Sequence, residues 1–69
     1  MSRGKLKWFN TDKGFGFIAG DDGQDYFLHH SQIPEGESFA EGEDIDFEVN
    51  QTDRGPQAIN VKKVMGEQE

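Results

Sequence analysis

Hydrophobic and polar residues alternate with a period of two along most of this chain, which is the pattern of β-strands that bury one face. The alternation is clearest over residues 44–49, where Ile45, Phe47 and Val49 are separated by acidic residues. Turn signals separate the alternating stretches, among them Gly20-Asp21-Asp22-Gly23, whose Asp-Gly pair suits a hairpin. The pattern predicts five short strands, over residues 5–9, 15–18, 25–29, 44–49 and 57–62, and one helical turn within residues 31–42.

Five strands of this kind favour a closed barrel over an open sheet. An open sheet in so small a chain would leave an apolar face and two unpaired edges, and closure removes both. We therefore predict an all-β, five-stranded barrel whose thin core gives a modest stability, under about 5 kcal/mol. The predicted inward residues are Leu6, Ile18, Leu28, Ile33, Ile45, Phe47, Val49, Ile59 and Val61.

Length and composition limit the class of protein. A chain of 69 residues allows one small domain over residues 1–69 and excludes a two-domain enzyme. The absence of cysteine excludes a disulfide framework and a thiolate metal site. No apolar run approaches the roughly 20 residues of a membrane span, and the N-terminus lacks the apolar stretch of a signal peptide. We expect a soluble cytoplasmic protein with a folded core at about residues 3–64 and a frayed tail over 65–69.

The charge is strongly acidic overall but unevenly distributed. A net charge of −7 by itself argues against a nucleic-acid partner, because phosphate repels carboxylate. The formal charge is +3 over residues 1–20, −11 over residues 21–53 and +1 over residues 54–69. If the two basic ends lie side by side in the fold, one face of this acidic protein is locally positive. The net charge therefore does not exclude nucleic acid.

Aromatic residues gather in the first half of the chain, where six of the eight lie between Trp8 and Phe27. If Ile18 and Leu28 point inward, alternation places the rings of the same two strands on the opposite face. We define the predicted aromatic face as Trp8, Phe15, Phe17, Phe27 and His29.

Exposed rings interleaved with lysines suit stacked nucleobases, and each such contact is worth roughly 1–3 kcal/mol. The plainer alternative is that the rings form the core, but strand alternation already assigns the aliphatic residues to the inside. The aromatic face therefore favours binding of single-stranded nucleic acid.

Several motifs carry a family resemblance. Residues 13–18, Lys-Gly-Phe-Gly-Phe-Ile, look like the first ribonucleoprotein motif, and residues 26–30, Tyr-Phe-Leu-His-His, resemble the second, usually Val-Phe-Val-His-Phe. Residues 4–10, Gly-Lys-Leu-Lys-Trp-Phe-Asn, precede them, and residues 54–58, Arg-Gly-Pro-Gln-Ala, follow. With this combination the chain resembles the bacterial cold-shock proteins from about Arg3 to Val64. The larger RNA-recognition fold has the two motifs in the opposite order with a helix between them, so the barrel is favoured.

The resemblance implies an antiparallel Greek-key barrel of the oligonucleotide-binding type that holds single-stranded RNA or DNA, often as an RNA chaperone. It implies that the residues of the aromatic face stack on bases. It also implies that Lys7, Lys13 and Arg54 meet phosphates or base edges and that Asp25 accepts a hydrogen bond from a base.

The sequence departs from the family pattern at three places. His30 stands where a Phe is usual, which makes that binding residue a smaller ring that is sensitive to pH. The loop from Ser31 to Gly42 is about two residues shorter than usual and lacks an aromatic tip, and Phe39 falls at a core position instead. Tyr26 replaces a small inward aliphatic residue. We expect a shortened binding footprint at the His30 end.

Other signals favour structural explanations. Gly14-x-Gly16-x-x-Ala19 fits a dinucleotide fingerprint, but a turn and not a helix follows, so close backbone packing explains the glycines better. His29 and His30 are adjacent strand residues on opposite faces and have no further His or Cys to complete a metal site. The spacing of the three aspartates between residues 21 and 25 lacks the features of a calcium loop, and the acids of residues 44–48 share one solvated strand face.

These observations converge on a monomeric, non-enzymatic protein without cofactor, metal or membrane partner that binds single-stranded RNA and DNA. The alternative is a barrel of the same fold that uses the aromatic face for a peptide or partner protein. Three to four phosphate contacts predict a shallow salt dependence, with a slope of about −2 to −3 on single strands.

Overall fold

The computed structural model describes residues 2–64, and the predicted tail over 65–69 lies outside the described residues. The five strands are β1 (Ser2–Asn10), β2 (Phe15–Gly20), β3 (Asp25–His29), β4 (Asp44–Thr52) and β5 (Gly55–Lys63). A single 3-10 turn, η1 (His30–Gln32), is the one helical element of residues 2–64. The all-β prediction is confirmed, and the helical turn begins one residue earlier than expected.

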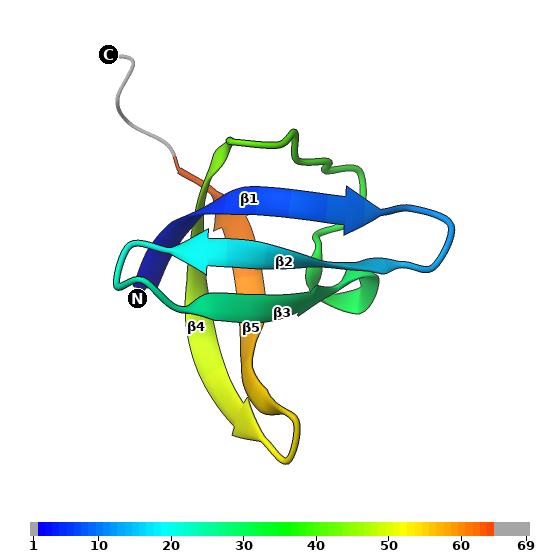
Figure 1. Ribbon diagram of the computed structural model, residues 1–69. Helices are drawn as coiled ribbons and strands as arrows, with labels where there is room; N and C mark the ends of the chain where they lie inside the picture. The colour runs from blue at the N-terminus through cyan, green and yellow to red at the C-terminus, as the bar shows by residue number, and fades with distance from the viewer. Residues whose placement is uncertain (1, 65–69) are drawn as a thin grey trace.

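The strands close into a barrel in the order β1-β2-β3-β5-β4, which confirms the predicted architecture. β1, β2 and β3 form an antiparallel meander, and β4 and β5 form a long hairpin that projects beyond it (Figure 1). β4 pairs with β1 on one side and with β5 on the other, and β3 meets β5 in parallel.

The basic ends of the chain do not lie side by side, because β4 separates β1 from β5. Two of the basic side chains of β1 instead pair with acids of β4. Arg3 Nε lies 2.9 Å from Asp46 Oδ1, and Lys5 Nζ lies 2.5 Å from Asp44 Oδ1. Much of the positive charge of the first strand is therefore neutralised across the β1–β4 seam, and the proposed positive face does not form there.

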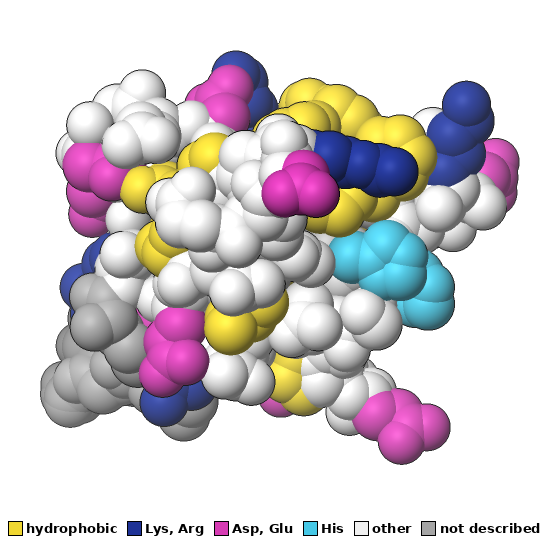
Figure 2. Space-filling model, turned by 90° about the horizontal axis from the view of Figure 1, so that it is seen from below, with side chains coloured by type: hydrophobic (Ala, Val, Ile, Leu, Met, Phe, Trp, Pro, Cys, Tyr) yellow, Lys and Arg dark blue, Asp and Glu magenta, His cyan; other side chains and the backbone are white. Residues whose placement is uncertain are grey.

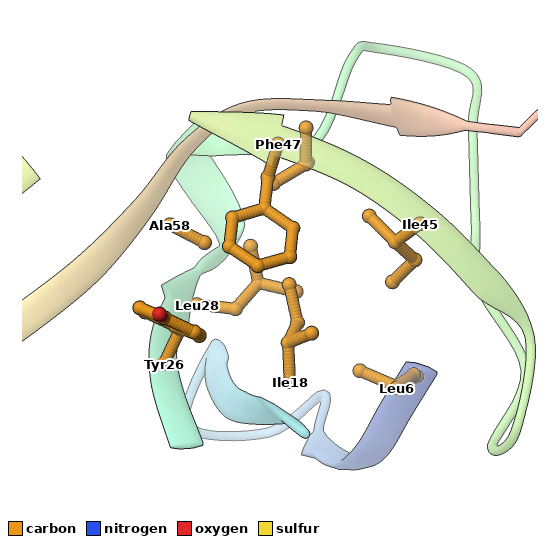
Figure 3. Close-up of a cluster of buried hydrophobic side chains, with 8 residues drawn as sticks. Leu6, Ile18, Tyr26, Leu28, Ile45, Phe47 and Ala58 are labelled. Carbon is orange, nitrogen blue, oxygen red and sulfur yellow. The ribbon is translucent and has the colours of Figure 1, made fainter. Parts of the chain in front are cut away.

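The core lies inside the barrel, with the Phe47 ring among aliphatic side chains from the other strands (Figure 3). Six of the nine predicted core residues are buried, and Ile33 is partly buried against them. The buried set is Leu6, Ile18, Tyr26, Leu28, Ile45, Phe47, Ala58 and Val61.

Two predicted core residues, Val49 and Ile59, are not buried, and the prediction was wrong for both. Val49 is 38% exposed because the β4–β5 hairpin continues past the part of the barrel that could cover it. On β5 the pairing register shifts opposite Phe47, and Asn60 has a positive φ of 52°. This bulge reverses the alternation, so that Ala58 and Val61 point inward while Ile59 is only partly buried.

Tyr26 is accommodated within the core despite its size. Its ring lies 5.0 Å from the Phe47 ring, and its hydroxyl donates a hydrogen bond of 2.5 Å to Asp22 Oδ2 at the β2–β3 turn. The polar end of the side chain is thereby satisfied at the edge of the barrel. Phe39 is partly buried against the core, in agreement with the expectation from sequence.

Candidate nucleic-acid interface

The predicted aromatic face is assembled on one side of the β1-β2-β3 meander. Cross-strand pairing sets Phe17 opposite Phe27 and Phe15 opposite His29. The Phe17 and Phe27 rings are 5.7 Å apart, the Phe15 and Phe27 rings 5.8 Å apart, and the Trp8 ring lies 5.5 Å from Phe17. The face is therefore one continuous ring cluster whose members hold one another in place.

A β-bulge explains why Trp8 belongs to this face. Leu6 pairs with Ile18 and Trp8 pairs with Phe17, so β1 has one extra residue, Lys7, between the two pairs. Strict alternation would have put Trp8 inside with Leu6. β2 approaches β1 closely beside the bulge, where a Cβ on Gly16 would lie 2.1 Å from the Trp8 carbonyl oxygen.

The rings of the face are open to solvent in part. Trp8 is 37% exposed, and the phenylalanines and His29 are half-buried. The planes of neighbouring rings are tilted, by 67° between Trp8 and Phe15 and by 76° between Phe17 and Phe27. Figure 2 shows a hydrophobic patch with a basic side chain across it and histidine side chains beside it. Such rings leave π surface on which a planar base can stack.

The three predicted cations have different surroundings. Lys7 Nζ lies 2.8 Å from Asp25 Oδ2, so two of the predicted binding residues are paired with each other. The Lys13 ammonium and the Arg54 guanidinium form no ion pair with any of residues 2–64. Lys13 lies in the 11–14 turn and Arg54 in the turn at the tip of the β4–β5 hairpin, which extend from different sides of the barrel (Figure 1). These two cations are available to phosphate without loss of a partner.

A groove of about 550 Å³ continues the aromatic face toward the β4–β5 hairpin. Phe17, Phe27 and Asp25 form one wall, and residues 52–57 form the other. Of this second wall only Arg54 was predicted from the sequence, and Pro56 and Gln57 were not. Both residues belong to the 54–58 motif, which was the available sequence signal for them. In the structure Gln57 is the residue of β5 that pairs with Phe27.

The two histidines lie at the other end of the face. His29 Nδ1 accepts the Ser31 backbone N–H at 3.2 Å, which caps η1. The two rings were expected on opposite faces of one strand, which was wrong, because β3 ends at His29 and His30 begins η1. The His30 ring stacks on His29 with centroids 4.4 Å apart and rests against the backbone of Gly14. A Cβ on Gly14, whose φ is +80°, would lie 2.6 Å from His30 Cδ2. Close packing therefore accounts for both glycines of the Gly14-x-Gly16 pattern, and a strand, β2, follows them.

Residues 2–64 contain no group of three or more His, Cys, Asp or Glu side chains that could hold a metal ion. Among the same residues no helix is long and apolar enough to cross a membrane.

Comparisons with known proteins agree with this geometry. The family model of the "cold-shock" DNA-binding domain matches residues 2–64. The chain is 51% identical over 67 residues to cold shock protein CspB of Bacillus caldolyticus, covering 93% of this chain and 100% of that protein. It is 46% identical over 66 residues to the major cold shock protein of Streptococcus pyogenes serotype M18, covering 93% and 98%.

A solved structure shares the fold at lower sequence identity. The structure of drosophila Unr CSD456 matches with a TM-score of 0.78 and 20% identity, covering 99% of this chain and 28% of that one. At this identity the match is evidence for the barrel alone.

Proposed function

Because this chain belongs to the "cold-shock" DNA-binding domain family, we propose that it binds single-stranded RNA and DNA on the aromatic face. We propose further that it acts as a monomeric RNA chaperone, with residues 3–64 as its binding domain. It would keep RNA unpaired by holding exposed bases, and it would release the RNA without hydrolysis.

The observation that carries this proposal is the continuous cluster of half-exposed rings. Trp8, Phe17 and Phe27 are linked by centroid distances of 5.5 and 5.7 Å, and their tilted planes leave π surface exposed. Stacking on such rings needs unpaired bases, because the bases of a duplex are already stacked on one another. Single strands are therefore the expected ligand.

The charges of the face support stacking as the main source of affinity. Lys13 and Arg54 are the two proposed phosphate contacts without an ion-pair partner in residues 2–64. Two such contacts give a salt slope of about −1.4 on single strands, and release of Lys7 from Asp25 would bring it to about −2. Long-range attraction to nucleic acid is weak for a chain with net charge −7.

The fluorescence of Trp8, the single tryptophan of the chain, tests the proposal directly. The protein is titrated with oligothymidine, with mixed-sequence single strands and with duplex DNA, each at two salt concentrations. We expect quenching by both single strands, little response to duplex, and a slope between about −1 and −3. No response to any oligonucleotide would contradict the proposal and would favour a peptide ligand for the same rings.

A further inference from the structure

Two stacked imidazoles lie at one end of the aromatic face and differ in their surroundings. The planes of the His29 and His30 rings are inclined at 34°. His29 ends β3 and lies beside Phe27, with ring centroids 6.4 Å apart. His30 begins η1 and is exposed. Figure 2 shows histidine side chains next to the hydrophobic patch.

His29 uses one of its ring nitrogens to cap η1. Its Nδ1 atom accepts the Ser31 backbone N–H and lies 2.9 Å from the Ser31 hydroxyl oxygen. A ring nitrogen that accepts an N–H carries no proton itself, so the ring proton of His29 is on Nε2. Protonation of Nδ1 would break the cap, and His29 therefore suits a stacking role.

His30 is fixed in position, but its ring nitrogens are not engaged. Its backbone N–H donates to the Gly14 carbonyl oxygen at 2.8 Å, and its ring packs against the same residue. Neither ring nitrogen has a hydrogen-bond partner among residues 2–64. Protonation of His30 therefore breaks no hydrogen bond within this part of the chain.

His30 shares a small surface depression with two charged side chains of the 11–14 turn. His30, Lys13 and Gly14 line a shallow depression of about 390 Å³, together with Asp12 of the same turn. The titratable groups that face His30 are thus Lys13 and Asp12 from the 11–14 turn and His29 from β3. Lys13 forms no ion pair within residues 2–64, so its charge remains available to an anion beside His30.

We propose that Lys13 and His30 form a phosphate subsite at this end of the aromatic face, and that His30 takes up a proton when a nucleic-acid phosphate binds there. This inference rests on the proposed single-strand binding. Stacked imidazoles disfavour two positive charges at this distance. A proton on His29 Nδ1 would cost the hydrogen bond from Ser31, and a proton on His30 costs none, so the proton goes to His30. His29 stacks on a base while His30 contacts the neighbouring phosphate.

The proposal fixes the direction of a pH effect. A bound phosphate favours the imidazolium form, so the complex holds more protons than the free protein. Affinity for single strands therefore rises as the pH falls through the range in which imidazoles titrate. One further cationic contact also makes the salt slope steeper by about 0.7 at the lower pH.

The experiment measures the affinity for oligothymidine by Trp8 fluorescence at about pH 5.5 and about pH 7.5. The wild-type chain should bind about two- to fivefold more tightly at the lower pH, the size of an exposed ion pair. The matched variant His30→Phe keeps a ring but cannot take up a proton, and its affinity should not change with pH. His29→Gln should bind more weakly at both pH values and keep the pH dependence.

Each outcome decides the proposal. Loss of the pH dependence in His30→Phe supports it, as does an NMR titration of both imidazoles in which only the His30 midpoint moves to higher pH with oligothymidine. A wild-type affinity that does not change with pH would overturn it, and so would a pH dependence that persists in His30→Phe. In both cases quenching by single strands would leave the proposed function standing. Absence of quenching at either pH would overturn the proposed function and this inference together.

Discussion

The ammonium group of Lys7 lies 2.8 Å from Asp25 Oδ2, so a cation and an acceptor that were both expected to meet nucleic acid are paired with each other. Their side chains are 49% and 50% exposed. An ion pair this exposed contributes about 0–1 kcal/mol to stability, because water and salt screen it. The Lys7–Asp25 ion pair should therefore affect the affinity for nucleic acid more than the stability of the fold.

Asp25→Asn should release Lys7 and remove a negative charge from the face. We expect tighter binding of oligothymidine at low salt and a slope steeper by about 0.7, with little change in the unfolding midpoint. Lys7→Gln is the matched control. It leaves the carboxylate unpaired beside the phosphates, so it should weaken binding. Weaker binding by Asp25→Asn at every salt concentration would show that the carboxylate contacts a base directly.

Phe17→Ala and Phe27→Ala should each weaken oligothymidine binding by about 1–3 kcal/mol, roughly 5- to 150-fold. Both rings are half-buried on the outside of the barrel, so circular dichroism should show a folded domain. Phe39→Leu removes a ring that packs against the core instead, and it should reduce stability without changing the affinity of the folded protein. If either alanine variant unfolds, that ring is part of the core.

Tyr26→Phe should lower the thermal midpoint near neutral pH, with a smaller difference in acid. The Tyr26 hydroxyl is the main cause that lowers the pKa of Asp22, and the Gln24 backbone N–H adds to it. A carboxyl whose folded pKa lies below its unfolded value stabilises the fold above the unfolded value, about 3.9. That contribution disappears as the pH falls through the folded pKa. Thermal melts of both proteins from about pH 7 to pH 2 measure it, and a difference that is constant with pH would contradict this account.

Asn60→Val should destabilise the barrel by about 1–3 kcal/mol, because a β-branched residue is strained at the positive φ of 52°. Asn60→Gly should be better tolerated, since glycine adopts this conformation freely, although it loses the 3.0 Å hydrogen bond from Asn60 Nδ2 to Glu48 Oε1. Urea unfolding measures both. Equal stabilities of the two variants would show that the bulge does not depend on this residue.

The barrel and most of the core followed from period-two alternation and turn chemistry, and Ile59 shows where alternation fails. Alternation assigns a face only while the pairing is uninterrupted. The bulges at Lys7 and Asn60 each shift the register. The first brings Trp8 to the predicted aromatic face, which strict alternation from Leu6 would not do, and the second turns Ile59 away from the predicted core. A bulge is a property of two paired strands, so the hydrophobic pattern of one strand alone does not predict it.

The positions of the aromatic rings could be predicted from the sequence, but the ion-pair partners of the charged residues could not. Alternation alone placed Phe15, Phe17 and Phe27 on one face, because β2 and β3 pair without a bulge. The partners of the cations could not be predicted in this way. Lys7 and Asp25 are on strands separated by β2, and their pairing follows from the lengths and directions of two side chains across the meander.

Phe27 also takes part in closing the barrel. It pairs with Gln57 of β5, and this is the single parallel register pair of the described residues. A junction held at so few points is where the closed sheet should open most readily in native fluctuations. A base that rests on the Phe27 ring would also restrain that opening. Amide hydrogen exchange along β3 and β5 should then slow when a single strand binds. Binding on the outer face would thus be measurable as less frequent local opening of the β3–β5 junction.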